Sequence, residues 1–200
     1  MTQHSSLVGV AGVKFSPLKQ ESGLWVAKKI YEFPYAINMK VEPEQSTEKQ
    51  YADNKLVDMV VSTGSTKVEM EMRDLPHEIS IMLLGLEEEN GMLLYKKNNI
   101  PPWVAMSFYG VKANGKKRYV GLVQGRFSIP GTDVKTKEEK VDFQTAKLSG
   151  EFLDREQDEL YKVVADEDTE GFDLDKFYKK VYGDAYQSTE KISADLGKGA

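Results

Sequence analysis

Two apolar strands on either side of an Asn-Gly turn constrain the fold of this chain more than any other feature. The first strand covers residues 103–109, the second covers residues 118–123, and Asn114-Gly115 lies between them. Asn-Gly favours the positive φ angles that the type I′ turn of a tight hairpin requires. The sequence therefore predicts a long β-hairpin between Pro101 and Ile129.

A two-residue turn at Asn114-Gly115 also predicts the register, with Phe108 opposite Gly121 and Tyr109 opposite Val120. An aromatic ring over Gly121 would fill the space left by its missing side chain. One face of the hairpin then carries Val104, Met106, Phe108, Tyr119 and Val123, and the other carries Trp103, Tyr109, Val120 and Leu122. Because both faces are apolar, we expect a second sheet, a helix or another subunit to cover each of them.

Length, charge and composition exclude several classes of protein. The chain has 200 residues, of which 40% are hydrophobic, enough for one domain with its own core. Its 27 basic and 32 acidic residues give a net charge of −5, which argues against wrapping nucleic acid through phosphate contacts. Cysteine is absent, which excludes disulfides and thiolate chemistry. No stretch approaches the roughly 20 apolar residues of a membrane-spanning helix.

The pattern along the chain predicts one domain between two flexible ends. Residues 1–13 are small and glycine-containing and indicate a flexible arm, and residues 183–200 indicate a flexible tail. Between them, residues 14–182 form a single domain. Its first strand pair is expected over Gly12–Pro17 and Leu24–Tyr31, around a turn at Ser22-Gly23.

Two further strands alternate strictly between apolar and polar residues. In Tyr35–Glu42 the inward residues are Ile37, Met39 and Val41. In Lys67–Arg73 they are Val68, Met70 and Met72, and the opposite face carries Lys67, Glu69, Glu71 and Arg73. Each is predicted to be a strand with one buried face and one solvated face.

Residues 43–66 lie between these two strands and are polar without clear periodicity. Loops of this length in a compact domain are usually functional or disordered. The centre of the segment holds Leu56, Val57, Met59, Val60 and Val61, with Tyr51 before them. We expect an extended loop that becomes ordered against a partner, and the alternative is an ordinary mobile loop.

Two helices complete the predicted fold. The first follows Asp74 as its cap and ends at Gly85, with an apolar stripe of Ile79, Met82, Leu83 and Leu86. The second covers Phe172–Tyr182, with Leu174, Phe177, Tyr178 and Val181 on one side. Another strand is expected over Val141–Leu153 with a bulge near Thr145-Ala146, and the acidic residues 154–171 are expected at the surface. The predicted class is mainly β: an antiparallel β-sandwich or barrel with one flanking α-helix, a long extended loop and a short C-terminal helix.

The sequence offers no convergent set of catalytic, cofactor-binding or metal-binding residues. His4 and His77 are the only histidines, so metal sites and catalytic triads that need histidine have little to use. Residues 166–171 resemble the opening of an EF-hand loop, but its twelfth position is Phe177, which cannot bind calcium. Such a protein is predicted not to be an enzyme and to act through its interfaces. The alternative is a monomeric β-sandwich binding module that recognises carbohydrate or a host surface. Trp25, Trp103 and Tyr109 would then form a platform on which a sugar ring stacks.

The order of several short motifs resembles one known family. The motifs are Val68-Glu69-Met70-Glu71-Met72, Asp74-Leu75-Pro76, Pro101-Pro102-Trp103-Val104-Ala105, Gly125-Arg126-Phe127-Ser128-Ile129-Pro130 and Lys140-Val141-Asp142-Phe143-Gln144-Thr145. In this order, over roughly residues 10–182, they resemble the major tail proteins, or tail tube proteins, of long-tailed bacteriophages that infect Gram-positive bacteria. None of the motifs is specific alone.

The resemblance implies a structural virion protein, made in the host cytoplasm, that assembles into stacked hexameric rings. The rings form a tube through which DNA passes without specific binding. It implies that Glu69 and Glu71 are candidates for the lumen, and that residues 43–66 reach the neighbouring ring through Tyr51, Leu56, Val57 and Met59. It also implies contacts with tape measure, tail terminator and distal tail proteins, and no membrane or cofactor. Acidic side chains in the lumen would repel the phosphate backbone of DNA.

Overall fold

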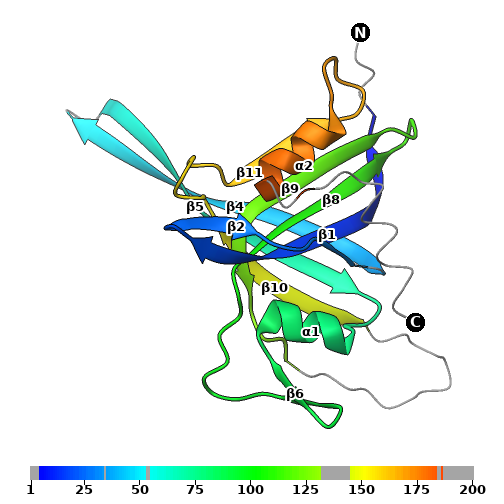
Figure 1. The fold of residues 1–200 in the computed structure, drawn as a ribbon. Helices are drawn as coiled ribbons and strands as arrows, with labels where there is room; N and C mark the ends of the chain where they lie inside the picture. Colours follow the sequence, from blue (N-terminus) through cyan, green and yellow to red (C-terminus); the bar gives the residue numbers. More distant parts are fainter. Residues whose placement is uncertain (1–4, 34, 53–54, 132–144, 184–185, 187–200) are drawn as a thin grey trace, which may run out of the picture.

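The computed structural model describes residues 5–33, 35–52, 55–131, 145–183 and 186, with the backbone alone at Ala52 and Leu56. The chain is mainly β and antiparallel with two helices, which confirms the predicted class (Figure 1). The strands are β1 (Leu7–Glu21), β2 (Leu24–Ala27), β3 (Tyr31–Phe33), β4 (Ala36–Ala52), β5 (Lys55–Met72), β6 (Glu87–Glu89), β7 (Met92–Leu94), β8 (Val104–Lys112), β9 (Lys117–Phe127), β10 (Ala146–Leu153) and β11 (Lys162–Asp166). The helices are α1 (His77–Leu84) and α2 (Leu174–Tyr182).

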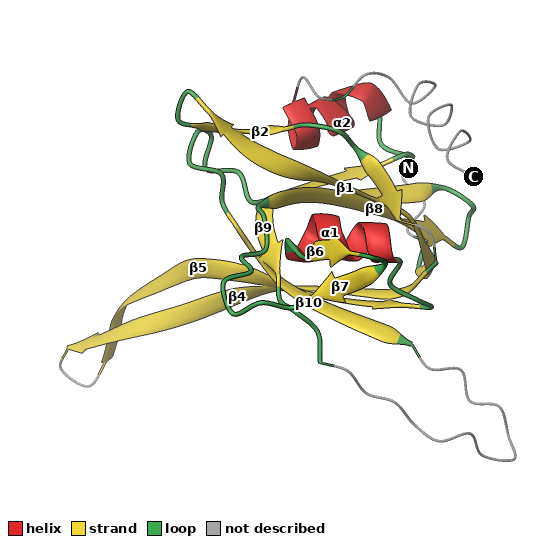
Figure 2. Ribbon diagram, turned by 60° about the horizontal axis from the view of Figure 1, so that its bottom comes forward, coloured by secondary structure: helices red, strands yellow, loops and turns green. Residues whose placement is uncertain are grey.

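One sheet bends over itself to make the sandwich. Its strands follow the order β2-β1-β8-β9-β10-β5-β4, while β3 pairs with β1 and β11 pairs with β9. β1 also contacts β4, so the two ends of this path approach each other. Figure 2 shows the β1–β8 layer above, the β10–β5–β4 layer below, and α1 between them. β6 and β7 form a separate two-stranded sheet.

The β8–β9 hairpin is covered on both faces, as the sequence predicted. On one face, Met106 and Leu122 belong to a core that includes Leu83 and Leu84 of α1. On the other face, Tyr119 belongs to a second core that includes residues of α2. The two helices therefore lie on opposite sides of this hairpin.

The predicted register of the β8–β9 hairpin is wrong by one residue. The turn is closed by the bond from Lys112 N–H to Lys116 C=O, so its loop has three residues and not two. Gly115 N–H donates to Lys112 C=O, and Gly115 has a φ of 79°, whereas Asn114 is not among the residues with positive φ. This is a type I turn followed by a left-handed glycine, which is common in three-residue hairpins.

The shifted register reverses the faces of β9, because neighbouring residues of a strand point to opposite sides. Ser107 lies opposite Gly121, and Tyr109 lies opposite Tyr119. Tyr119 therefore faces α2 and Leu122 faces α1, the reverse of the predicted positions. A bulge between Val104 and Met106 then moves the pairing by one residue, so that Val104 lies opposite Gly125.

Gly121 is covered by α2 and not by the predicted aromatic ring of β8. A Cβ atom at this position would lie 2.3 Å from Cγ2 of Val181 and 3.3 Å from the ring of Phe177. The missing side chain lets α2 approach the strand closely.

Type I′ turns occur elsewhere in the chain. Ser22 and Gly23 have φ angles of 52° and 84° and join β1 to β2 in the predicted strand pair. Asn90 and Gly91, at 52° and 77°, join β6 to β7. β1 begins at Leu7 and pairs there with β8, so the part of the expected arm from Leu7 onward is a paired strand.

The described residues between 43 and 66 do not form an irregular loop. Residues 43–52 and 55–66 are the outer half of the β4–β5 hairpin, with pairs that continue from Pro43 opposite Thr66 to Ala52 opposite Lys55. Figure 1 shows this ribbon projecting from the body of the molecule. Both faces of a projecting ribbon meet solvent, so its strands need no apolar alternation, and the sequence pattern could not reveal them. A bulge after Ala36 also leaves Ile37 exposed, contrary to its predicted inward position.

The second helix follows its predicted stripe, but the first does so only in part. In α1, Ser80 and Leu84 are buried with Ile79 and Leu83, Met82 is half-buried, and Leu86 lies beyond the end of the helix. Gly85 ends α1 with a φ of 64°, but Asp74 does not cap it, since Pro76 occupies that position and Asp74 accepts a bond from Leu75 N–H. In α2, Phe177, Tyr178, Val181 and Tyr182 are buried. The acidic region before α2 contains β11, a strand that the sequence analysis missed. The expected bulge near Thr145-Ala146 falls at the edge of residues 132–144, which lie outside the described chain.

Candidate assembly surfaces

The projecting half of the β4–β5 hairpin, which we call the hairpin arm (residues 43–66), exposes a row of large apolar side chains. Tyr51, Val57, Met59, Val60 and Val61 are each between 53% and 63% exposed. Tyr51, Val57 and Met59 are residues that the family resemblance assigned to a contact with the next ring. Leu56 lies opposite Tyr51 in the ladder, and its side chain is outside the described part of the structure.

Strand geometry places these apolar groups on both faces of the hairpin arm. Met59 lies opposite Lys49 and Val61 opposite Thr47, so these two apolar side chains share one face. Val60 lies opposite Glu48 and points to the other face. The arm is held by its own ladder and by a bond of 2.6 Å between the hydroxyls of Ser46 and Ser62. Exposed apolar groups on a regular hairpin are typical of a surface that another chain covers.

A second surface is the polar face of the β4, β5 and β10 strands. Glu69 lies between Lys40 of β4 and Ser149 of β10, and Glu71 lies between Asn38 and Lys147. Glu69 is exposed, whereas Glu71 is half-buried and accepts a bond of 2.5 Å from the Thr145 hydroxyl. The predicted polar face is therefore present, and both glutamates lie on it.

Acidic and basic side chains alternate across this polar face. Lys67 lies 2.6 Å from Glu44, and this hydrogen-bonded pair raises the pKa of Lys67 and lowers the pKa of Glu44. Lys40 lies 2.8 Å from Glu42, which raises the pKa of Lys40. The face thus carries charges of both signs, and much of its acidity is balanced locally.

A cluster of four charged residues fastens β11 to the end of the β8–β9 hairpin. Arg118 donates two bonds to Asp166, of 2.6 and 2.7 Å. Lys112, whose side chain is only 5% exposed, lies 2.6 Å from Asp168 and 3.3 Å from Asp166. Hydrogen bonds from Arg118 and Lys112 lower the pKa of Asp166, and the bond from Lys112 lowers the pKa of Asp168. The sequence analysis did not find this cluster, because its partners lie far apart in the chain and no local pattern links them.

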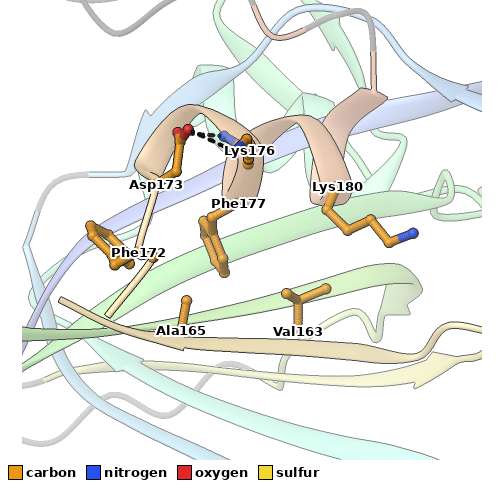
Figure 3. A pocket seen from close by; sticks show the side chains of 8 residues that line it. Val163, Ala165, Phe172, Asp173, Lys176, Phe177 and Lys180 are labelled. Atoms are coloured by element: carbon orange, nitrogen blue, oxygen red, sulfur yellow. Dashed lines mark hydrogen bonds and ion pairs between the residues drawn. The ribbon is translucent and has the colours of Figure 1, made fainter. Parts of the chain in front are cut away.

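Between α2 and β11 lies a shallow hollow of about 350 Å³ (Figure 3). Its floor is apolar, and lysines of α2 form part of its rim. Val163, Ala165, Gly171, Phe172, Asp173, Lys176, Phe177 and Lys180 line it.

Other candidate sites do not form in the described part of the chain. No group of three or more metal-binding side chains occurs among those residues. His77 is exposed at the start of α1, and His4 lies outside the described residues. The rings of Trp25 and Trp103 are 5.9 Å apart, whereas Tyr109 packs on Tyr119 in the second core, so the three do not make one stacking platform.

Comparison with known proteins gives one clear result. A family model described as phage tail tube protein matches residues 42–190, about three quarters of the chain. The match includes the hairpin arm, the hollow and the β5 and β10 strands of the polar face, whereas Asn38 and Lys40 of β4 lie before it. No curated protein matches the chain. In the described residues, neither helix has the length and apolar character needed to cross a membrane.

Proposed function

The chain belongs to the phage tail tube protein family, and from this premise we propose that it closes into hexameric rings that stack into a DNA-conducting tube. Its role in the tail of the virion is structural. The proposal makes two specific claims: six subunits close into each ring, and DNA passes through the tube. The observation that carries it is the hairpin arm, whose apolar side chains are exposed on a well-paired ribbon.

In the proposed tube, the hairpin arm reaches the next ring. Burial of a methionine or valine side chain stabilises a contact by about 1.5–3 kcal/mol when it is complete. Among its described side chains, the arm carries five large exposed apolar groups, namely Tyr51, Val57, Met59, Val60 and Val61. A contact that joins two different surfaces of identical subunits repeats without limit and therefore builds a filament.

The polar face of β4, β5 and β10 would line the lumen. A lumen that conducts DNA must not hold the phosphate backbone through clustered lysine and arginine. Lys40 and Lys67 are each paired with a glutamate of the same face, and Glu69 adds a further negative charge. The balance of charge therefore supports passage of DNA without strong binding.

Further parts of the proposal rest on the family. Tape measure, tail terminator and distal tail proteins would contact the tube, and the assembly needs no catalytic activity or cofactor. The body of each subunit would run from Leu7, where β1 begins to pair with β8, to Tyr182, and the segments outside it would lie along neighbouring subunits.

Electron microscopy of the purified protein over a series of concentrations tests this function. We expect rings or tubes of uniform diameter for the unchanged chain. A variant in which residues 46–62 are replaced by Asn-Gly should keep its unfolding temperature but lose stacking. Leu24→Ser is a matched control, because Leu24 is 49% exposed but lies outside the arm. Dispersed particles of the unchanged chain at high concentration, even with tail assembly factors added, would overturn the proposal.

A further inference from the structure

We propose that neighbouring subunits within a ring join through the β6–β7 ribbon of one copy and the α2–β11 hollow of the next. This inference rests on the proposed ring and identifies the lateral surfaces that close it. The partner is thus a second copy of this chain. Four features of the two surfaces carry the argument: apolar character, charge, open strand edges and position.

The hollow is an apolar surface that the described chain leaves uncovered. Figure 3 shows Phe172 and Phe177 on one side of it and Val163 and Ala165 of β11 on the other. β11 pairs with β9 alone, so its outer backbone edge is open in the described sheet. An open edge beside an apolar floor invites pairing with another chain.

The β6–β7 ribbon and the segment that follows it expose apolar groups of suitable size. Met92 is 55% exposed, Tyr95 is 58% exposed and Ile100 is 69% exposed, all within nine positions of the sequence. Met92 lies opposite Glu89, so both point to the same face of the ribbon. Leu93, on the other face, packs against the first core and holds the ribbon to the body.

The charges of the two surfaces are complementary. Glu88 and Glu89 are exposed on the ribbon and have no ion-pair partner among the described residues, while Glu87 pairs with Lys96. On α2, the exposed Lys179 likewise has no such partner in the part described. Lys176 and Lys180 reach Asp173 and Asp158 only at 3.5 and 3.9 Å. Glu89, which shares a face with Met92, can therefore meet Lys176 and Lys180, which line the hollow with Phe177. Glu88 lies opposite Leu93 on the other face of the ribbon.

The two surfaces lie on opposite sides of the subunit. The ribbon and α1 adjoin the first core, α2 adjoins the second, and the β8–β9 hairpin separates the two cores. Figure 1 shows β6 and α2 at opposite ends of the molecule. Contacts between two different surfaces of identical subunits close into a ring when the rotation permits it. The placement of the ribbon and the hollow meets the first requirement of such a ring.

Because the chain has no cysteine, site-directed cross-linking gives a clean test. The variant carrying both Met92→Cys and Lys180→Cys, treated with a short bis-maleimide, should give a ladder of covalent oligomers. Each single variant is the control and should give only the background of random collision. No ladder, or equal cross-linking of a single variant, would overturn the lateral contact. Tubes without a ladder would contradict this inference alone, whereas a ladder without tubes would contradict the proposed stacking alone.

Charge reversal gives a second test that does not depend on the cross-linker. Glu89→Lys should raise the concentration needed for oligomers about tenfold, as should Lys176→Glu with Lys180→Glu. A mixture of the two variants should recover assembly, because the opposite charges again meet across the interface. Asp154→Lys with Glu156→Lys is the control, since these exposed acids lie outside the ribbon. Unchanged assembly of both reversed variants, or failure of the mixture to recover, would argue against the contact.

Discussion

The two halves of the β4–β5 hairpin have similar residues but opposite environments. At the base, Val68 and Met70 are 1% and 3% exposed. In the arm, Met59 and Val61 are each 53% exposed. β5 pairs with β4 along both halves, so hydrogen bonding to that neighbour does not explain the difference.

The difference arises from what lies beside and beneath the strand. At the base, Met70 lies between Met39 of β4 and Leu148 of β10, and the first core covers its side chain. β10 ends its pairing with β5 at Thr66, and beyond that residue β5 pairs with β4 alone. Whether an apolar residue of β5 is buried in the core of its own subunit or left exposed for a contact with another subunit thus depends on the presence of β10 beside it.

The largest expected effect is on the base of the hairpin. Met70→Ala should lower the free energy of unfolding by about 2–5 kcal/mol, because it leaves a cavity in a well-packed core. Urea unfolding followed by tryptophan fluorescence, at a concentration below assembly, would measure it. Met70→Leu, which conserves volume, should cost less than about 1.5 kcal/mol and serves as the control. A loss below 1 kcal/mol for Met70→Ala would show that the base is not packed as described.

The sequence predicted those features whose partners lie within regular, periodic elements. Val68, Met70 and Met72 alternate, and the stripe of α2 recurs at helical spacing, so their buried faces could be read directly. The same alternation placed Glu69 and Glu71 on the polar face. It could not decide whether that face meets a lumen, because a lumen exists only when several copies assemble.

The register of the β8–β9 hairpin shows where local rules stop. Gly115 has positive φ in a two-residue and in a three-residue loop alike, so the Asn-Gly pair fits both. In the observed loop, the side chain of Asn114 accepts a hydrogen bond from Lys116 N–H. The Asn-Gly pair alone does not predict this stabilising bond. Packing decides the choice, since the observed register puts Tyr119 against Phe177 of α2. The charged cluster around Lys112 could not be predicted for a similar reason, because Asp166 and Asp168 come close to Lys112 only when the chain folds.

A smaller effect on the free energy of unfolding is expected at acidic pH. It should differ between the charged cluster in the body of the subunit and the ion pair on the hairpin. The pKa values of Asp166 and Asp168 are lowered below their ordinary value of 3.8 in the folded chain. Their stabilising contribution is therefore complete above about pH 5 and is lost as the pH falls below about 4. Asp166→Asn should cost roughly 1 kcal/mol at neutral pH and flatten the pH dependence below 5.

The hairpin supplies the matched comparison for this pH effect. Glu44, paired with Lys67, also has a lowered pKa, but both side chains are well exposed. Solvent and salt screen such a pair, so Glu44→Gln should leave the unfolding curve unchanged at every pH. Urea unfolding between pH 3 and 7 would measure both variants. Equal loss in the two would mean that the cluster around Lys112 is no better shielded than the exposed pair.

Little effect on stability is also expected when the first substitution is repeated in the arm. Met59→Ala should change the free energy of unfolding by less than about 0.5 kcal/mol, because the side chain already meets solvent. It should nevertheless raise the concentration needed for tubes about tenfold or more, since the lost burial of about 1.5–3 kcal/mol is felt at every contact. Sedimentation and electron microscopy would measure assembly, and urea unfolding would measure stability. If Met59→Ala destabilises the single subunit as Met70→Ala does, the arm folds back on its own chain, and the two halves of the hairpin do not differ in the way proposed.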